Sequence, residues 1–378
     1  MRRQTFSHNM GWLTILILVI TLSCSLLNST APKRSTPQPT VSPTGQEQPT
    51  SPLQDILVDY VYTSNLITII YPLYGSVLDD FSIVTLTNTL STQAQAIVES
   101  EIIGYTTKSI DTVTIEPGES VEVRQNPLLI PEVIDELNVQ KPAQFHLKVS
   151  RLESGEQHTI LEETGDTLVY ARRDFPWSIP GFTDQEVFEL LAAMVTPNDP
   201  SVEELIRTAA DYTSSGSMWS GYGDQLNDED WEVWERLEAI WKAEDEDYHL
   251  TYISTHVSFA PRSVQRIRLP AEVLEQRSGN CIETTLLFAS AAEALDLEAA
   301  IIGIPGHSFV GVRLDQENDI YYFIETTVIG KASFQEAVDL GKEEFDEALP
   351  HLDAEESEYG WLSVWDAREK GILPLPWH

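Results

Sequence analysis

The pattern of apolar and polar residues divides the chain into a β-rich half followed by a helix-rich half. From about residue 56 to residue 177, short runs rich in β-branched residues are separated by Gly, Pro, Asn and Asp. Several of these runs alternate apolar with polar positions, which is typical of strands. About seven or eight strands in such a stretch predict an immunoglobulin-like β-sandwich. The expected strands include Leu66–Tyr71, Phe81–Asn88, Ser120–Arg124 and Phe145–Val149.

From residue 183 onward, the apolar positions recur at helical spacing. Capping-box patterns precede two of the apolar runs, Thr183 with Glu186 and Ser201 with Glu204. Such a pattern marks the N-terminus of a helix. A third helix is expected to open at residues 227–230. The β-rich half contains no catalytic constellation that we can identify, so we interpret it as a spacer or a binding module.

Three further strands are expected near the C-terminal end, at residues 300–304, 307–314 and 320–326. If the last two pair about position 316, His307 lies directly opposite Glu325. Directly opposed residues have Cβ atoms about 4.5–5.5 Å apart, which suits a hydrogen bond between an imidazole and a carboxylate. A final amphipathic helix is expected over residues 334–349.

The first 53 residues have the pattern of an export signal followed by a tether. Two arginines precede a short apolar run at residues 12–20, and Cys24 follows a small residue. The run is too short for a comfortable membrane span and is typical of a signal peptide. Cys24 resembles the lipid-modified cysteine of bacterial lipoproteins, with a plain cleaved signal or an uncleaved anchor as alternatives. Residues 25–53 are rich in Pro, Ser and Thr and predict an extended linker.

Length and charge narrow the class of protein. The 378 residues predict two domains, and a hydrophobic content of 42% can form a sizeable core. We place the domains at residues 54–178 and 179–378, in an α+β fold. The net charge of −37 argues against nucleic acid or an anionic membrane surface as a partner. Neutral or cationic substrates suit this charge, although acidity that keeps a secreted protein soluble is the simpler explanation.

Cys281 is the candidate nucleophile. Asn280 with Glu283 predicts a helix N-terminus, so Cys281 is expected to be the first helical residue. The helix dipole can lower a thiol pKa from about 8.5 to about 3.5–7.5, and the Glu283 carboxylate opposes this effect. If Cys24 carries lipid, Cys281 has no cysteine partner and is a candidate reactive thiol. A buried core cysteine is the simpler alternative.

Residues 265–327 resemble the core of the transglutaminase-like superfamily, a papain-like fold. In that family a catalytic cysteine, histidine and acid follow one another in this order. The motif Gly279-Asn-Cys281 is similar to the turn before the catalytic helix, and Gly306-His-Ser-Phe309 is similar to the histidine strand. Glu325-Thr-Thr327 stands where an Asp-Pro-Thr-like motif is usual, so Glu replaces Asp and Thr replaces Pro.

The resemblance implies that Cys281 attacks a carboxamide or peptide carbonyl and forms a thioester. His307 would activate the thiol, and Glu325 would orient His307. The backbone N–H of Cys281 and the side chain of Gln265 would hold the oxyanion. An ordinary polar loop residue is an equal interpretation of Gln265.

Two hypotheses follow from the sequence. The first is an extracytoplasmic, membrane-anchored cysteine peptidase, amidase or transglutaminase-type acyltransferase that acts on a peptide or protein, such as one of the cell envelope. The alternative is a catalytically inactive surface protein on the same fold that binds peptide or glycan. No cofactor or metal is expected, because the sequence has neither a His-Glu-x-x-His pattern nor a glycine-rich phosphate loop.

Overall fold

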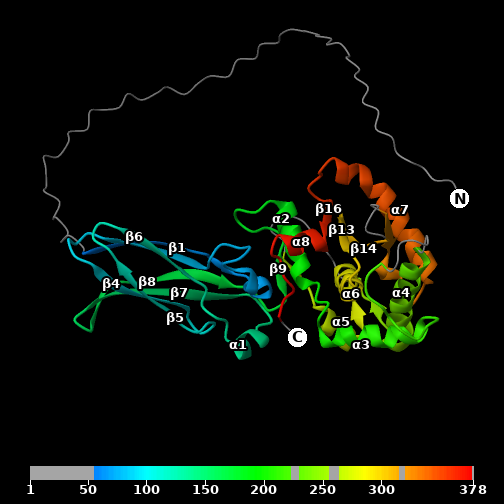
Figure 1. The fold of residues 1–378 in the computed structure, drawn as a ribbon, viewed down its shortest axis with the longest axis horizontal. Helices are drawn as coiled ribbons and strands as arrows, with labels where there is room; N and C mark the ends of the chain where they lie inside the picture. The colour runs from blue at the N-terminus through cyan, green and yellow to red at the C-terminus, as the bar shows by residue number, and fades with distance from the viewer. Residues whose placement is uncertain (1–54, 223–229, 255–263, 315–319, 377–378) are drawn as a thin grey trace, which may run out of the picture. The chain divides into compact units, whose positions relative to one another are not determined.

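The structure of the protein is a computed structural model that describes residues 55–222, 230–254, 264–314 and 320–376 (Figure 1). The expected signal sequence with Cys24 and the linker to residue 53 lie outside the described residues. Residues 52–378 form one compact unit. Helices and sheets together give an α+β fold, which confirms the predicted class. Within the described residues, no helix is both long enough and apolar enough to cross a membrane.

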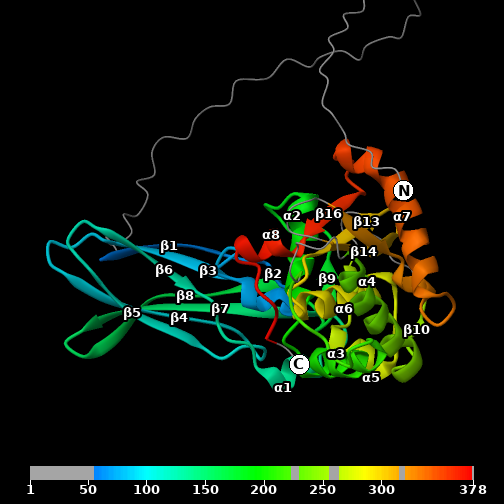
Figure 2. The same cartoon turned by 45° about the vertical axis from the view of Figure 1, so that its right-hand side comes forward.

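The β-rich half consists of two sheets that face each other across a hydrophobic core (Figures 1 and 2). One sheet has the strand order β1-β3-β6 and the other has the order β2-β8-β7-β4-β5. Apolar side chains of both sheets, such as Leu86 and Leu147, belong to one buried cluster. The strands are β1 (Ile56–Tyr62), β2 (Asn65–Leu66), β3 (Ser82–Asn88), β4 (Ala94–Ile102), β5 (Ser109–Ile115), β6 (Ser120–Gln125), β7 (Lys141–Glu153) and β8 (Glu156–Val169), with helix α1 (Pro131–Asp135) between β6 and β7.

The prediction of a strand over Leu66–Tyr71 is wrong. Strand β2 ends at Leu66, and Thr68–Leu73 forms the 3₁₀ helix η1 with most of its residues buried. A short apolar run does not distinguish a buried strand from a buried helical turn. Pro72, within η1, also lacks the N–H that a strand ladder needs.

The helical half begins much as the sequence predicts. Thr183 caps α2 (Asp184–Glu189) and forms the expected capping box with Glu186. Helix α3 (Pro200–Ala209) is capped by Asp199 rather than by Ser201, because Pro200 occupies the first helical position with its preset φ. The other elements up to residue 279 are η2 (Leu190–Met194), η3 (Ala210–Tyr212), α4 (Asp230–Lys242), the π-helical turn η5 (Ala243–Asp247), α5 (Pro270–Gln276), and strands β9 (Asp174–Pro176), β10 (Thr251–Tyr252), β11 (Val264–Arg266) and β12 (Ser278–Gly279).

An antiparallel sheet with the order β15-β14-β13-β16 organises the C-terminal part. One of its faces joins the main hydrophobic core together with α6, and the other packs against α7 through a separate aromatic cluster (Figure 1). The elements are α6 (Cys281–Ala294), β13 (Ala299–Ile304), β14 (His307–Arg313), β15 (Tyr321–Ile324), η6 (Thr326–Val328), α7 (Phe334–Asp353), β16 (Gly360–Ser363) and α8 (Val364–Glu369).

The register of β14 and β15 differs from the expected one by two residues. Val310 pairs with Ile324 and Arg313 with Tyr321, so the pairing is centred on position 317 rather than 316. The Leu314 N–H donates to the Ile320 carbonyl and continues this register to the end of the ladder. A two-residue slip preserves the faces of the strands. His307 and Glu325 therefore remain on the same side, as diagonal neighbours.

Candidate active site

Cys281 is the first residue of α6, as the sequence predicts. The Asn280 Oδ1 accepts from the Glu283 N–H at 3.1 Å, and the Glu283 Oε2 accepts from the Asn280 N–H at 2.9 Å. Gly279 is required here because a Cβ at this position would lie 2.8 Å from the Thr284 Cγ2. The thiol is free, and the residue is 1% exposed.

Arg268 neutralises the acid that shares the first turn of α6 with Cys281. Its Nη2 lies 2.6 Å from the Glu283 Oε2, and its Nε donates to the Glu283 Oε1 at 3.0 Å. The backbone N–H of Arg268 donates to the same Oε1 at 2.9 Å. The expected opposition of the Glu283 carboxylate to a thiolate is therefore offset by a guanidinium, and the favourable end of the helix dipole remains.

His307 and Glu325 meet at the edge of the sheet. His307 is the first residue of β14, and its Nε2 lies 2.6 Å from the Glu325 Oε2. The other Glu325 oxygen accepts from the Thr327 N–H at 2.7 Å, which makes Glu325 the N-cap of η6. The Cys281 thiol, at the start of α6, contributes to the raised pKa of the His307 imidazole. The structure thus brings together the three residues that the sequence singles out.

The charges of this trio are strongly coupled. Burial disfavours the His307 imidazolium, but its interactions with Cys281, Glu325 and Glu344 outweigh burial and raise its pKa to about 12. Burial alone would raise the pKa of Glu325, yet its interactions with His307, Glu344 and Thr327 together outweigh burial and lower that pKa. At neutral pH the site therefore holds an imidazolium beside a carboxylate.

Thr326 joins the acid-bearing segment to the cysteine helix. Its Oγ1 lies 2.8 Å from the Oγ1 of Thr284 on α6, within hydrogen-bond distance. The hydroxyl of Thr284 also lies 3.1 Å from the Cys281 carbonyl oxygen and donates to it. A proline at position 326 would have no hydroxyl for this contact. The threonine that departs from the family motif therefore has a structural role in this chain.

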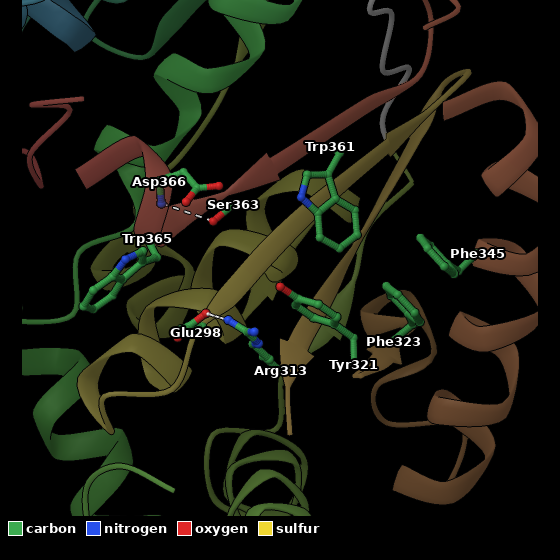
Figure 3. A pocket seen from close by; sticks show the side chains of 9 residues that line it. All are labelled: Glu298, Arg313, Tyr321, Phe323, Phe345, Trp361, Ser363, Trp365 and Asp366. Atoms are coloured by element: carbon green, nitrogen blue, oxygen red, sulfur yellow. Dashed lines mark hydrogen bonds and ion pairs between the residues drawn. The ribbon is translucent and has the colours of Figure 1, made fainter. Parts of the chain in front are cut away.

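Glu344 is a member of the site that sequence reasoning missed. It lies on α7, and its Oε2 is 3.5 Å from the His307 Nε2. Gly341, one turn earlier, allows the helix to approach β15, because a Cβ there would lie 2.6 Å from the Phe323 carbonyl oxygen. Phe345 stacks on Phe323 with ring centroids 3.7 Å apart (Figure 3). In the sequence, the sign of this close contact between helix and strand is Gly341, a glycine inside a helical pattern.

Gln265 is a buried strand residue, not a loop residue. It lies in β11, which pairs with β9, and its Oε1 accepts from the Trp177 Nε1 at 3.2 Å. An indole N–H can only donate, so this contact settles which amide atom faces Trp177. The Gln265 Nε2 is buried without a hydrogen-bond partner among the described residues. Arg268, which holds the first turn of α6, follows three residues later.

His307, Glu325 and Glu344 also form the kind of group that can bind a metal, since their ligand atoms lie within 4.8 Å of one another. Tetrahedral zinc with bonds of about 2.0–2.2 Å would hold its ligand atoms roughly 3.3–3.6 Å apart. The 2.6 Å between the His307 Nε2 and the Glu325 Oε2 is instead the length of a charge-assisted hydrogen bond. The geometry of this pair favours proton chemistry.

A separate cavity of about 610 Å³ is lined by strand residues and by residues of α7 and α8 (Figure 3). Its walls carry five aromatic side chains, among them Tyr321, Trp361 and Trp365, and an ion pair of Glu298 with Arg313 at 2.7 Å. Neither Cys281 nor His307 is among its lining residues. The cavity is therefore a surface distinct from the trio.

Comparison with known proteins does not place the chain in a family. No protein-family profile matches the sequence, and neither does any curated protein. Among solved structures, the chain is similar to the crystal structure of a FixG-related protein from Vibrio parahaemolyticus, with a TM-score of 0.21 and 12% sequence identity. That match covers 32% of this chain and 99% of the other. A TM-score this low carries no argument about fold or function.

Proposed function

We propose that this chain is a cysteine acyl-transfer enzyme of the transglutaminase-like superfamily. In this proposal a papain-like domain at residues 179–378 follows an immunoglobulin-like sandwich at residues 54–178, and lipid on Cys24 anchors the protein outside the cytoplasm. The observation that carries the proposal is that the His307 imidazole lies 2.6 Å from the Glu325 carboxylate, while the Cys281 thiol contributes to the raised pKa of the same imidazole. A histidine between a helix-start thiol and an acid is the arrangement of an activated nucleophile.

Each residue has a defined part in the proposed reaction. In the reactive form His307 holds the proton of Cys281, and the thiolate sulfur attacks the carbonyl carbon of a carboxamide, so that a C–S bond forms and negative charge moves to oxygen. When the intermediate collapses, the C–N bond breaks and His307 protonates the leaving amine. Water or a second amine then attacks the thioester, and the thiol is restored. Glu325 keeps the imidazole oriented and stabilises its charged form.

Two N–H groups suit the oxyanion of this intermediate. The backbone N–H of Cys281 belongs to the first turn of α6 and has no intrahelical acceptor. The Gln265 amide nitrogen is buried without a hydrogen-bond partner among the described residues, and its orientation is fixed by Trp177. A buried donor without a partner costs about 1–3 kcal/mol, and an oxyanion would supply the missing acceptor.

Acyl transfer can be tested without knowledge of the natural substrate. The purified protein, treated with p-nitrophenyl acetate, should release a burst of p-nitrophenolate and carry one acetyl group on Cys281, located by peptide mass mapping. C281S should show no burst, and H307A should lose it. H146A is the matched control, since His146 also contacts two carboxylates, Glu101 and Glu162. An acetylation rate at Cys281 that H307A leaves unchanged would contradict the proposal.

The anchor is tested separately. Mass analysis of the mature N-terminus should find a diacylglycerol group on Cys24. Cleavage at another position, or an intact leader, would overturn this part of the proposal and leave the chemistry of Cys281 untouched.

The aromatic cavity supports a second candidate function, a surface protein that binds peptide or glycan without catalysis. Trp365 lines the cavity and is largely exposed, and aromatic faces suit either ligand. Calorimetry with an N-acetylated amino-sugar oligosaccharide and with a neutral hexapeptide tests this candidate. Binding that W365A abolishes and C281S retains supports it, whereas no heat from either probe counts against it.

A further inference from the structure

We propose that Glu344 is a positioning residue of the site: as a neutral carboxylic acid, it donates a hydrogen bond to Glu325 and thereby holds that carboxylate against His307. The inference deepens the proposed function, on which it rests for its catalytic consequence. The starting observation is geometric. The ligand atoms of His307, Glu325 and Glu344 lie within 4.8 Å of one another, although the three residues come from β14, the end of β15 and α7.

The packing of α7 fixes this placement. Gly341 allows the helix to touch the backbone of β15, and the stacked rings of Phe345 and Phe323 hold the next turn. The Glu325 N–H donates to the Ala337 carbonyl at 3.0 Å, which ties the acid-bearing segment to the start of the same helix. Glu344 follows Gly341 by three residues and so lies on the same helix face. Its approach to Glu325 is therefore built into the contact between helix and strand.

Two carboxyl groups this close cannot both carry charge at low cost. Glu325 is 3% exposed, and the Oε2 of Glu344 is buried although that side chain is 32% exposed overall. Paired carboxyls in such surroundings share one proton. The groups that face His307 are the Cys281 thiol from α6, Glu325 and Glu344, and one imidazolium balances one carboxylate. A second ionised carboxylate would therefore have no cation to balance it, which favours a single proton on the carboxyl pair.

The shared proton belongs on Glu344. Burial raises the pKa of Glu344, and the neighbouring Glu325 raises it further against the opposing effect of His307. The hydrogen bond from His307 lowers the pKa of Glu325. Glu344 also keeps its Oε2 buried without a hydrogen-bond donor in the described part of the chain. An ionised carboxylate would require such a donor more strongly than a carboxylic acid does.

This role explains how a glutamate can serve where the resembling family has an aspartate. The additional methylene gives Glu325 one more rotatable bond, so its carboxylate needs further restraint to remain beside His307. The Thr327 N–H restrains one oxygen and His307 contacts the other. An ionised carboxylate can accept about four hydrogen bonds, which leaves room for a third donor from Glu344.

The test compares two substitutions that differ in hydrogen bonding. E344Q keeps a side-chain N–H donor without charge, whereas E344L removes the donor. The first readout is the downfield proton resonance of the His307 Nε2–H, which reports its hydrogen bond to Glu325. The second is the rate at which p-nitrophenyl acetate acetylates Cys281. E343Q, an exposed neighbour on the same helix, is the control.

We expect E344Q to keep the resonance and to acetylate within about threefold of the wild-type rate. E344L should lose or shift the resonance and acetylate about 10-fold to 100-fold more slowly, the range for loss of a hydrogen bond to a charged group. The proposal is overturned if E344Q is impaired as severely as E344L, or if neither variant differs from E343Q. If E344L does not fold, E344A, which admits water at the site, takes its place.

The two readouts separate this inference from the proposed function. If the wild-type protein is not acetylated at all, the enzyme proposal fails, and the resonance still reports whether Glu344 positions Glu325. If the wild type is acetylated and its resonance is the same in E344L, the enzyme proposal stands and the role of Glu344 is refuted.

Discussion

Two regions of the molecule each contain an almost completely buried glutamate. One glutamate has hydrogen-bond donors around it, and the other has a carboxylate oxygen without one in the described part of the chain. Glu325, after β15, is 3% exposed and accepts hydrogen bonds from His307 and the Thr327 N–H. Glu244, in the π-helical turn η5, is 2% exposed, and its Oε1 has no hydrogen-bond partner among the described residues. The pKa of Glu325 is lowered despite its burial, whereas burial raises the pKa of Glu244 well above its usual value.

The difference shows that burial alone does not identify a functional carboxylate. Glu325 keeps its negative charge because a cation contacts it, so it can orient and stabilise an imidazolium. Burial favours the neutral form of Glu244, whose Oε1 has no hydrogen-bond partner in the part of the chain that the structure describes. Glu283 extends the comparison, since it is also buried and Arg268 pairs with it. A cationic neighbour keeps a buried carboxyl group ionised, and only an ionised carboxylate can orient and stabilise a cation.

The largest expected effect is at Glu325. E325A removes the acid that orients His307, and acetylation of Cys281 by p-nitrophenyl acetate should slow by about 10²–10⁴-fold. E244A should leave the rate unchanged, because Glu244 has no part in the trio. Equal rates for E325A and the wild-type protein would remove the functional distinction between the two acids.

The second-largest expected effect is a loss of stability when Glu283 is left without its cation. R268M leaves the Glu283 carboxylate buried without its cation, which should lower the free energy of unfolding by about 3–5 kcal/mol. The double variant R268M/E283Q should recover much of this loss, because the neutral amide needs no cation. Urea unfolding of the three proteins measures both changes. Equal stability of R268M and the wild type would show that the ion pair is not needed.

A smaller, pH-dependent effect is expected at Glu244. Its folded-state pKa is raised, so it destabilises the protein progressively as the pH rises above the unfolded-state value of about 4.3. The free energy of unfolding of E244Q relative to wild type should therefore increase with pH, by up to about 1.4 kcal/mol per unit. Urea unfolding between pH 4 and pH 8 measures this difference. A constant difference across that range would show that Glu244 is not a buried neutral acid.

The smallest effect is expected at Trp177. W177F removes the indole N–H that orients the Gln265 amide, so acetylation of Cys281 should slow by roughly 10-fold, less than the loss of an oxyanion donor itself. Q265A should slow it by about 10²-fold, and W177F should add little in that background. If the rate effects of W177F and Q265A are additive, Trp177 does not act by orienting the Gln265 amide.

The local features of the site could be predicted from sequence, and the long-range ones could not. The Asn280 and Glu283 cap is a four-residue pattern, so the helix start at Cys281 follows from neighbouring residues. Arg268 contacts Glu283 and Glu344 approaches His307, each from another element, and no local pattern records such contacts. The β14–β15 register differs from the expected one by two residues, and only because this shift is even does His307 remain beside Glu325.

The central claim, that His307 activates Cys281, is tested most directly by the alkylation rate of Cys281 with iodoacetamide as a function of pH. The label is located by peptide mass mapping, with H307A and H146A measured beside the wild type. We expect fast labelling at neutral pH in the wild type and in H146A, and much slower labelling in H307A. Equal labelling rates of the three proteins at every pH would contradict the claim that His307 activates Cys281.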